Sequence, residues 1–431
     1  MGDDDKPVFM KRKLFFLERL LYGDGRAPFH AVFPIRISGA PALQNLRRGL
    51  EKVQSKHPLL QSRIVQDERG IPHFVADGNA SPIAVRIVDR KADDDWMRES
   101  MQEWVNPFDM EKGPLIRVVF LRGHSDHDLL LVFHHCICNG TSCILLMQEI
   151  LTLLDEPETE IGRYSHFITP EELLAENPVE RGAKRKARLK SILFHAFFSL
   201  KASMIHKKNI VTICREKDYL VNWKLDVATS RAIFNHCKQL RVTVNTALCV
   251  AFLSAFREVR GEANYNKITC PVDIRKYLPA GKRDDLFSFG LAIDLEMGKK
   301  APAGFRERAV SMHKEAVEKM NKLNIAEFLM PMEYSHAAIK PLMKVLQHGK
   351  RKTNLILSNM GRLELKNDYR SFRIESVYSP TVIGSFGDPT DIVTTTFGGC
   401  MDFCFVSNGE FVPYADALAI KDKATELLIP K

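Results

Sequence analysis

The chain lacks the features that mark exported or membrane-spanning proteins. None of its apolar runs approaches the ~18 residues of a bilayer-spanning helix, and residues 192–200 reach about half that length. No apolar segment follows the first charged residues, so we expect no signal peptide. The 9 cysteines are an odd number and mostly lie in apolar stretches, which argues against a disulfide framework. We therefore expect a reducing, cytoplasmic location.

Extremes of composition are also missing. Hydrophobic residues make up 45% and charged residues 27% of the 431 residues, values that exclude a disordered or collagen-like chain. We find no internal repeat. Strand and helix patterns alternate on both sides of a polar segment at residues 157–178. The sequence predicts an α/β fold in two halves, residues 7–178 and 215–431, joined by a basic linker or helix at residues 179–214.

Acidic residues are absent from residues 181–208, which hold nine basic residues, as many as the net charge of +9. Such a local segment argues against nucleic-acid binding and suits a phosphate group, an acidic carrier protein or an anionic membrane. The alternative is a solvated helix face. Four clustered basic residues form the patch predicted to bind such an anionic partner: Lys184, Arg185, Lys186 and Arg188. A peripheral membrane contact is the competing use, because apolar residues stand beside them: Leu189, Ile192, Leu193, Phe197 and Leu200.

The segment that best suggests chemistry follows an apolar strand at residues 129–133. It reads His134-His135-Cys136-Ile137-Cys138-Asn139-Gly140, and a helix is expected directly after it. Catalytic groups are often presented where strands end, and histidine can act as a general base near neutral pH. On these residues alone, a purely structural role is equally well supported.

Two other uses of this segment are disfavoured. The histidines with Cys136, Cys138 and Cys143 resemble a metal cluster, but the spacing does not match that of zinc sites, so we expect no metal. A catalytic cysteine thiolate is less expected than a buried cysteine that packs as a small hydrophobe. The run Asp93-Asp94-Asp95 fits the N-cap and first turn of a helix at residues 96–105 better than a metal site.

The histidine segment resembles the His-His-x-x-x-Asp-Gly signature of the condensation-domain superfamily. That group includes chloramphenicol acetyltransferase, condensation domains of peptide synthetases, plant BAHD acyltransferases and polyketide-associated acyltransferases. Further segments resemble superfamily landmarks in order along the chain: residues 46–64, 106–109, 113–117, 242–245, 271–275 and 358–362. The last of these, Ser358-Asn359-Met360-Gly361-Arg362, is similar to the Ser-Asn-x-Gly element of standalone alcohol acyltransferases.

The resemblance implies two chloramphenicol-acetyltransferase-like subdomains that form a V with a tunnel between them. It implies that His135 is the general base, that His134 supports it, and that no covalent acyl-enzyme forms. The sequence also contains no Gly-x-Ser-x-Gly nucleophile elbow. General-base assistance is typically worth about 10²–10⁴-fold in rate.

The resemblance also assigns expectations to residues around the histidines. Asn139, followed by Gly140, stands where the family has an aspartate that pairs with an arginine, matched here by Arg275. An uncharged acceptor should weaken that bond. Ser358 and Asn359 are candidate donors to the oxyanion of a tetrahedral intermediate, although a turn at a strand end is the alternative.

The implied reaction is acyl transfer from a thioester of coenzyme A or carrier-protein phosphopantetheine to an alcohol or amine, with O-acylation favoured. The thioester is a co-substrate, so no bound cofactor is expected. We also expect the protein to be a monomer. The other functional class is a catalytically degenerate domain that binds a synthetase or carrier protein without chemistry, for which His135 would be unnecessary.

Overall fold

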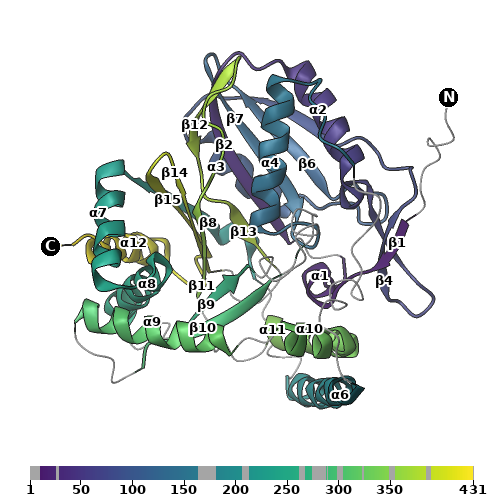
Figure 1. The fold of residues 1–431 in the computed structure, drawn as a ribbon, viewed down its shortest axis with the longest axis vertical. Helices are drawn as coiled ribbons and strands as arrows, with labels where there is room; N and C mark the ends of the chain where they lie inside the picture. Colours follow the sequence, from purple (N-terminus) through teal and green to yellow (C-terminus); the bar gives the residue numbers. More distant parts are fainter. Residues whose placement is uncertain are drawn as a thin grey trace.

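In the computed structural model, the protein has two lobes and a peripheral group of helices (Figure 1). The structure describes residues 10–25, 29–163, 181–205, 213–261, 267–273, 288, 290–298, 304–322, 325–348, 355–384 and 390–430. Each lobe is built around a six-stranded mixed sheet, and a three-stranded sheet lies beside the first lobe. The α/β fold expected from the sequence is confirmed.

The first sheet has the order β12-β2-β7-β6-β5, with β13 also paired to β2. Its two central strands are antiparallel and buried along most of their length, which explains why residues 129–133 are continuously apolar. The strands are β2 (His30–Gly39), β5 (Ala84–Asp89), β6 (Ile116–Arg122), β7 (Asp126–His134), β12 (Phe372–Val377) and β13 (Thr381–Ile383).

Helices cover both faces of this sheet. Two of them, α2 (Leu43–Lys56) and α4 (Gly140–Asp155), lie side by side over one face (Figure 1). A Cβ atom on Gly49 of α2 would lie 2.9 Å from the Leu153 Cβ, so glycine permits this close approach. His57, at the end of α2, bonds to Glu149 of α4, with 2.7 Å between Nε2 and Oε2. The third helix, α3 (Asp95–Val105), packs against β2, β6 and β7.

The three-stranded sheet was not predicted from the sequence. It contains β1 (Met10–Lys13), β3 (Arg63–Gln66) and β4 (Pro72–Ala76), and it adjoins α1 (Phe16–Tyr22) and the 3-10 helix η2 (Pro58–Gln61). Arg12 and Glu18 form a buried ion pair of 2.7 Å that joins β1 to α1. Strands of four or five residues carry too little alternation to be recognised by pattern.

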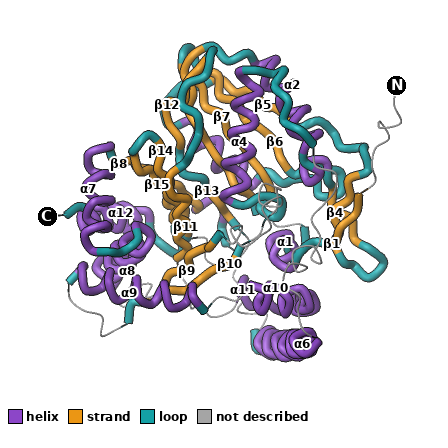
Figure 2. Tube along the Cα trace, viewed as in Figure 1, coloured by secondary structure: helices purple, strands orange, loops and turns teal. Residues whose placement is uncertain are grey.

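The second sheet has the order β10-β9-β11-β14-β15-β8. Four helices lie together on its outer side (Figure 2). The strands are β8 (Asp218–Leu225, after the 3-10 helix η4, Arg215–Lys217), β9 (Lys267–Val272), β10 (Leu291–Glu296), β11 (Leu355–Arg362), β14 (Asp391–Phe397) and β15 (Cys400–Asn408). The helices are α7 (Val227–Leu240), α8 (Val244–Arg260), α9 (Phe305–Asn321) and α12 (Tyr414–Leu428).

Helix α8 forms the centre of the second core. Its residues from Ala247 to Phe256 are buried, and Thr243 caps its start by accepting the Thr246 N–H at 3.1 Å. In the described part of the chain no single helix has the length and hydropathy of a membrane span, although α7 and α8 together do so with a bend of 102°.

The second half contributes two strands to the sheet of the first lobe. Strands β12 and β13 come from residues 215–431 but pair with β2 of the first sheet. The predicted basic helix is α6 (Arg181–Ser203), which packs against α10 (Ile325–Tyr334), the 3-10 helix η8 (Ser335–Ala338) and α11 (Ile339–His348). The 3-10 helix η8 separates α10, which contains Pro331, from α11.

Candidate active site

The histidine segment forms the turn that joins β7 to α4. The apolar run of β7 is held between β2 and β6, so the strand ends at a fixed point in the sheet. His135 follows the strand, and its N–H donates to the Phe29 carbonyl at 2.8 Å. The Ile137 N–H then closes the turn on the His134 carbonyl at 3.1 Å. The central strand therefore presents His135 at its end, as the sequence predicted.

The ring of His135 is held in one tautomer. Its Nδ1 lies 2.8 Å from the Cys138 carbonyl oxygen. A carbonyl can only accept, so Nδ1 carries the proton and Nε2 keeps an unprotonated lone pair. Burial lowers the pKa of His135, and the edge of the Phe29 ring, 5.6 Å away between centroids, is part of its surroundings. The ring is therefore a neutral base at neutral pH.

His134 has a different environment. It is fully buried, and its Nδ1 accepts the Cys136 N–H at 3.3 Å, which supports the turn that carries His135. Its ring meets the His30 ring edge-on at 5.7 Å between centroids. Burial lowers the pKa of His134 well below its usual range, so it stays neutral. This geometry fits a supporting role.

Asn139 is the N-cap of α4. Its Oδ1 accepts the Ser142 N–H at 3.0 Å and the Ser142 hydroxyl at 3.1 Å. The sequence predicted a helix start here but did not identify its cap. The expected partner, Arg275, lies outside the described residues, so that pairing stays a prediction.

Two residues of the second half, Asp273 and Met360, contact the histidine motif, and neither was predicted to do so from the sequence. The Thr141 hydroxyl donates to Asp273 Oδ2 at 2.6 Å, across 132 positions of sequence. A Cβ atom on Gly140 would lie 3.3 Å from the Met360 methyl group, so β11 packs directly on the motif glycine. Both Asp273 and Met360 lie inside segments that resemble family landmarks, which was the available signal.

The Ser358–Asn359 element lies on β11, beside Met360. Asn359 Oδ1 accepts the Gly361 N–H at 2.9 Å, and Gly361 has φ of +71°, a conformation that favours glycine. This segment is an irregularity within β11, whose register against β14 shifts between Asn359 and Arg362, and not a turn at the strand end. The Nδ2 amide is the hydrogen-bond donor of the Asn359 side chain. An oxyanion role for Ser358 and Asn359 remains a prediction.

The cysteines of the motif act as packing groups. Cys136, Cys138 and Cys143 are all buried. Burial raises the pKa of Cys136 well above its usual range, so a thiolate is disfavoured. The Cys143 thiol donates to the Gly140 carbonyl at 3.0 Å. Within the described residues, no three His, Cys, Asp or Glu side chains are grouped to hold a metal ion.

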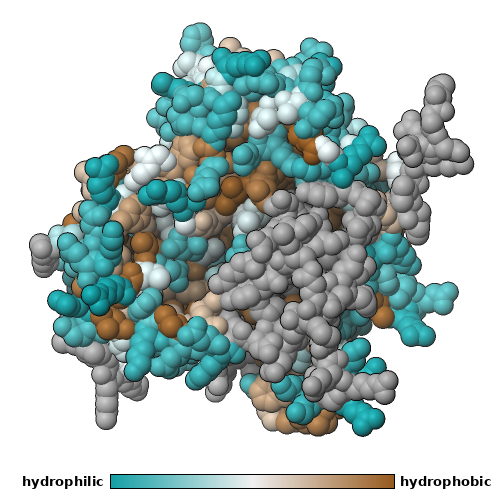
Figure 3. Space-filling model, viewed as in Figure 1, coloured by the Kyte–Doolittle hydropathy of each residue, from teal (hydrophilic) through white to brown (hydrophobic). Residues whose placement is uncertain are grey.

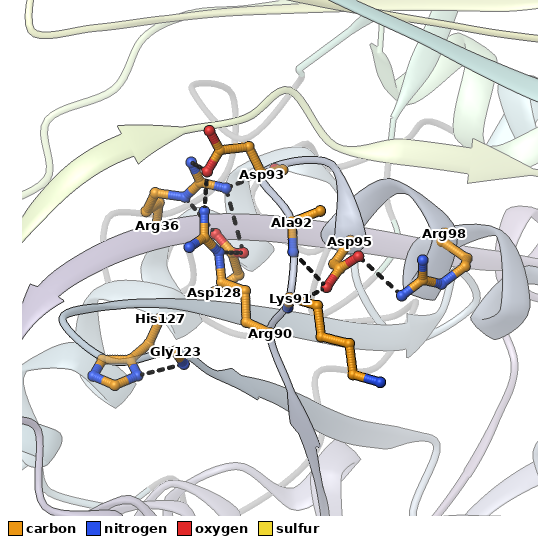
Figure 4. Close-up of polar contacts among 10 residues, drawn as sticks. All are labelled: Arg36, Arg90, Lys91, Ala92, Asp93, Asp95, Arg98, Gly123, His127 and Asp128. Carbon is orange, nitrogen blue, oxygen red and sulfur yellow. Dashed lines mark hydrogen bonds and ion pairs between the residues drawn. The ribbon is translucent and has the colours of Figure 1, made fainter.

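The aspartate run lies near the far end of β7 from His135 (Figure 4). Asp128 is fully buried between Arg36 and Arg90, whose Nε atoms donate to it at 2.8 and 2.9 Å. Asp93 bonds to the same two arginines. Asp94 is the N-cap residue of α3 and Asp95 lies in its first turn, as expected, although the Asp94 side chain makes no cap bond.

The Asp95 side chain bonds back along the chain to residues that precede α3. Its carboxylate accepts the Lys91 and Ala92 N–H groups at 2.6 and 3.0 Å, which lowers its pKa (Figure 4). The bonds to Lys91 and Ala92 fix the loop before α3. This cluster holds the sheet and is distinct from the motif.

The basic patch predicted to bind an anionic donor lies on α6, apart from the motif turn. Lys184, Arg185, Lys186 and Arg188 are exposed on α6, and Arg188 lies 5.4 Å from the Tyr334 ring of α10. The helix packs against α10, η8 and α11, which separate it from the two sheets (Figure 1).

Comparison with known proteins identifies the family to which the chain belongs. The family model described as "Condensation domain" matches residues 11–265, which include the whole histidine segment. The chain belongs to the condensation-domain family. The condensation-domain match spans both the motif turn and the start of the second lobe.

Among curated relatives of this condensation-domain protein is the phosphinothricin tripeptide synthetase PhsC of Streptomyces viridochromogenes. It is 30% identical over 167 residues, which are 36% of this chain and 15% of the synthetase. Bacitracin synthase 2 of Bacillus licheniformis is 27% identical over 149 residues, 34% of this chain and 6% of that protein. The chain therefore spans a small fraction of the length of these relatives.

Solved structures resemble this condensation-domain protein along nearly its whole length. The trichothecene 15-O-acetyltransferase of Fusarium sporotrichioides superposes with a TM-score of 0.72 at 12% identity, covering 99% of this chain and 96% of that one. The first condensation domain of the calcium-dependent antibiotic synthetase gives 0.70 at 14% identity, covering 98% and 96%. Polyketide synthase associated protein 5 of Mycobacterium tuberculosis gives 0.64 at 15% identity, covering 97% and 98%. These likenesses show the shared fold.

Proposed function

We propose that this condensation-domain protein transfers an acyl group from a thioester to a hydroxyl or amine, with His135 as the general base. One observation carries the proposal: the His135 Nδ1–H bond to the Cys138 carbonyl leaves the Nε2 lone pair as the basic atom.

The proposed reaction conserves every proton and electron pair. The acceptor oxygen or nitrogen attacks the thioester carbonyl carbon while its proton passes to His135 Nε2. The carbonyl becomes an oxyanion, and the new C–O or C–N bond is formed. When the intermediate collapses, the C–S bond breaks and the imidazolium returns its proton to the leaving thiolate. The buried Cys136 thiol is a poor nucleophile, which agrees with direct transfer.

Two side chains of the second lobe are the proposed stabilisers of that oxyanion. Ser358 and the Nδ2 amide of Asn359 lie on β11, whose Met360 packs on Gly140 of the motif. A well-placed donor of this kind is typically worth about 2.7–4 kcal/mol of transition-state stabilisation.

The proposed donor is a thioester of coenzyme A or of carrier-protein phosphopantetheine, and it is consumed as a co-substrate. The similarity to peptide synthetases supports a carrier-borne donor. The fold shared with an O-acetyltransferase supports a hydroxyl acceptor, so we place O-acylation before N-acylation.

A docking module without catalysis is the second candidate, and it is favoured by Asn139 at the position of the family aspartate. The test incubates the purified protein with a panel of acyl-coenzyme A and acyl-carrier thioesters, together with alcohols and amines. Free thiol is followed continuously, and products are identified by mass spectrometry. We expect thiol release that depends on the acceptor and yields an ester or amide. Binding to a carrier with no transfer to any acceptor would instead support the docking module.

A further inference from the structure

Helix α6 carries an apolar stripe that the fold does not cover. Five large apolar side chains on it are between 49 and 62% exposed: Leu189, Ile192, Leu193, Phe197 and Leu200. At about 100° per residue they fall on one side of the helix, over a length of about 17 Å. In Figure 3, brown atoms mark the lower edge of the molecule, where Figure 1 places α6.

The opposite side of α6 already supplies its packing. Ala187 and Ala202 are buried, and the Phe194 ring meets the Phe16 ring of α1 at 6.4 Å between centroids. Phe198 packs in the same cluster, beside Ile339 and Leu342 of α11. The exposed stripe is therefore not needed to hold α6 on the protein, and its apolar character requires another explanation.

The charges around the stripe identify its partner. Helix α6 contains seven Lys or Arg residues and no Asp or Glu. Lys184, Lys186 and Lys190 are exposed near the start of the stripe, and Lys201 reaches across it, with Nζ 4.2 Å from the Phe197 ring centroid. A second copy of the chain would bring like charges together, whereas an anionic surface would neutralise them.

We propose that α6 binds anionic phospholipid membranes by lying flat in the headgroup layer. The apolar stripe enters the boundary of the acyl chains, while the flanking lysines and arginines contact lipid phosphates. The packed face keeps α6 attached to α10 and α11, so the whole protein is held at the surface. This membrane site goes beyond the proposed acyl transfer and does not depend on it.

The test is co-sedimentation of the full-length protein with vesicles of phosphatidylcholine alone or with about 30% phosphatidylglycerol. We expect binding to the anionic vesicles that weakens as salt is raised. Two variants separate the apolar and the charge contributions to binding. Leu193→Gln with Phe197→Gln removes two central side chains of the stripe. Lys184→Gln with Lys186→Gln and Lys190→Gln removes three positive charges. Each should weaken binding at least about tenfold. The matched control, Val310→Gln with Val317→Gln, changes exposed apolar residues of α9 and should bind as the wild type does.

Three outcomes would overturn the proposal. The wild-type protein could remain in the supernatant with anionic vesicles. The stripe variant, confirmed as folded by circular dichroism, could bind as tightly as the wild type. Sedimentation velocity without lipid could show a dimer that the stripe variant abolishes, which would assign α6 to self-association. If charge removal raises the KM for an acyl-carrier donor and vesicle binding is absent, the helix recruits the donor instead.

Discussion

At the scale of single residues, the roles proposed for His135 and His134 follow from which ring nitrogen each one uses. Both rings are neutral, because burial lowers both pKa values. His135 donates from Nδ1 to a carbonyl and keeps Nε2 basic, whereas His134 accepts at Nδ1 from a backbone N–H. Adjacent histidines of the same chain therefore differ in what they can do for a substrate.

The pH dependence of acyl transfer should report His135. Its pKa lies below the ordinary 6.5, and the reaction needs the unprotonated ring. The rate should be level around neutral pH and fall as the pH drops through a midpoint below 6.5. A profile of kcat/KM against pH measures this. A rate that rises toward acid would mean that the protonated ring is the active form.

Asn139→Asp should be tolerated. A carboxylate can accept the same Ser142 N–H, and a negative charge at the first turn of α4 is favourable by about 0.3–1 kcal/mol. Asn139→Ala loses the cap and should cost about 0.5–2 kcal/mol. Thermal melts of both variants and their transfer rates test this pair. An Asn139→Asp protein less stable than Asn139→Ala would show that the cap geometry is not what holds the loop.

At the scale of elements, β13 shows how the second half is fixed to the first lobe. Trp104 of α3 is buried, and its Nε1–H donates to the Thr381 hydroxyl at 3.0 Å. This bond secures a three-residue strand that ordinary pairing would hold weakly.

Thr381→Val should therefore destabilise the protein. The substitution preserves shape but leaves the buried Trp104 N–H without its acceptor, at a cost of about 1–3 kcal/mol. Urea unfolding measures the change, with Val382→Thr, a less buried position on the same strand, as the control. An unchanged unfolding free energy for Thr381→Val would show that this bond does not anchor β13.

At the scale of the whole molecule, buried imidazoles should make stability depend on pH. Burial lowers the pKa of His30 from 6.5 to about 4, and its Nδ1 lies 2.9 Å from the Glu103 carbonyl oxygen. The folded pKa is below the unfolded one, so stability is complete above pH 6.5 and is lost as the pH falls toward 4. The loss approaches about 1.4 kcal/mol per pH unit in that window.

His30→Gln should flatten this dependence. Glutamine retains an N–H donor but does not titrate, so the slope of unfolding free energy between pH 4 and 6.5 should decrease. Unfolding curves of wild type and variant at several pH values give the two slopes. Equal slopes would assign the acid sensitivity to other groups.

The sequence predicted most of the fold, for reasons visible in particular segments. Residues 129–133 are so apolar that a strand was expected there, and the buried strand β7 is present. Strands β1, β3 and β4 are too short to show a pattern. The pairing of β12 with β2 joins positions more than 300 residues apart, and local periodicity carries no information about such partners.

For the site, the motif predicted where His135 would lie, but not how it would be held. The Cys138 carbonyl contact and the Thr141–Asp273 bond depend on tertiary placement of backbone and on the meeting of two lobes. Residue types and spacing alone cannot reveal either contact.

One measurement tests the central claim most directly: kcat/KM for acyl transfer by His135→Ala beside wild type. The control is His124→Ala, which changes an exposed histidine at the opposite end of β7. We expect His135→Ala to fold normally and to lose at least about 10²-fold in kcat/KM, the usual worth of a general base, while His124→Ala is unchanged. A folded His135→Ala protein that retained more than about a tenth of wild-type kcat/KM would contradict the proposed mechanism.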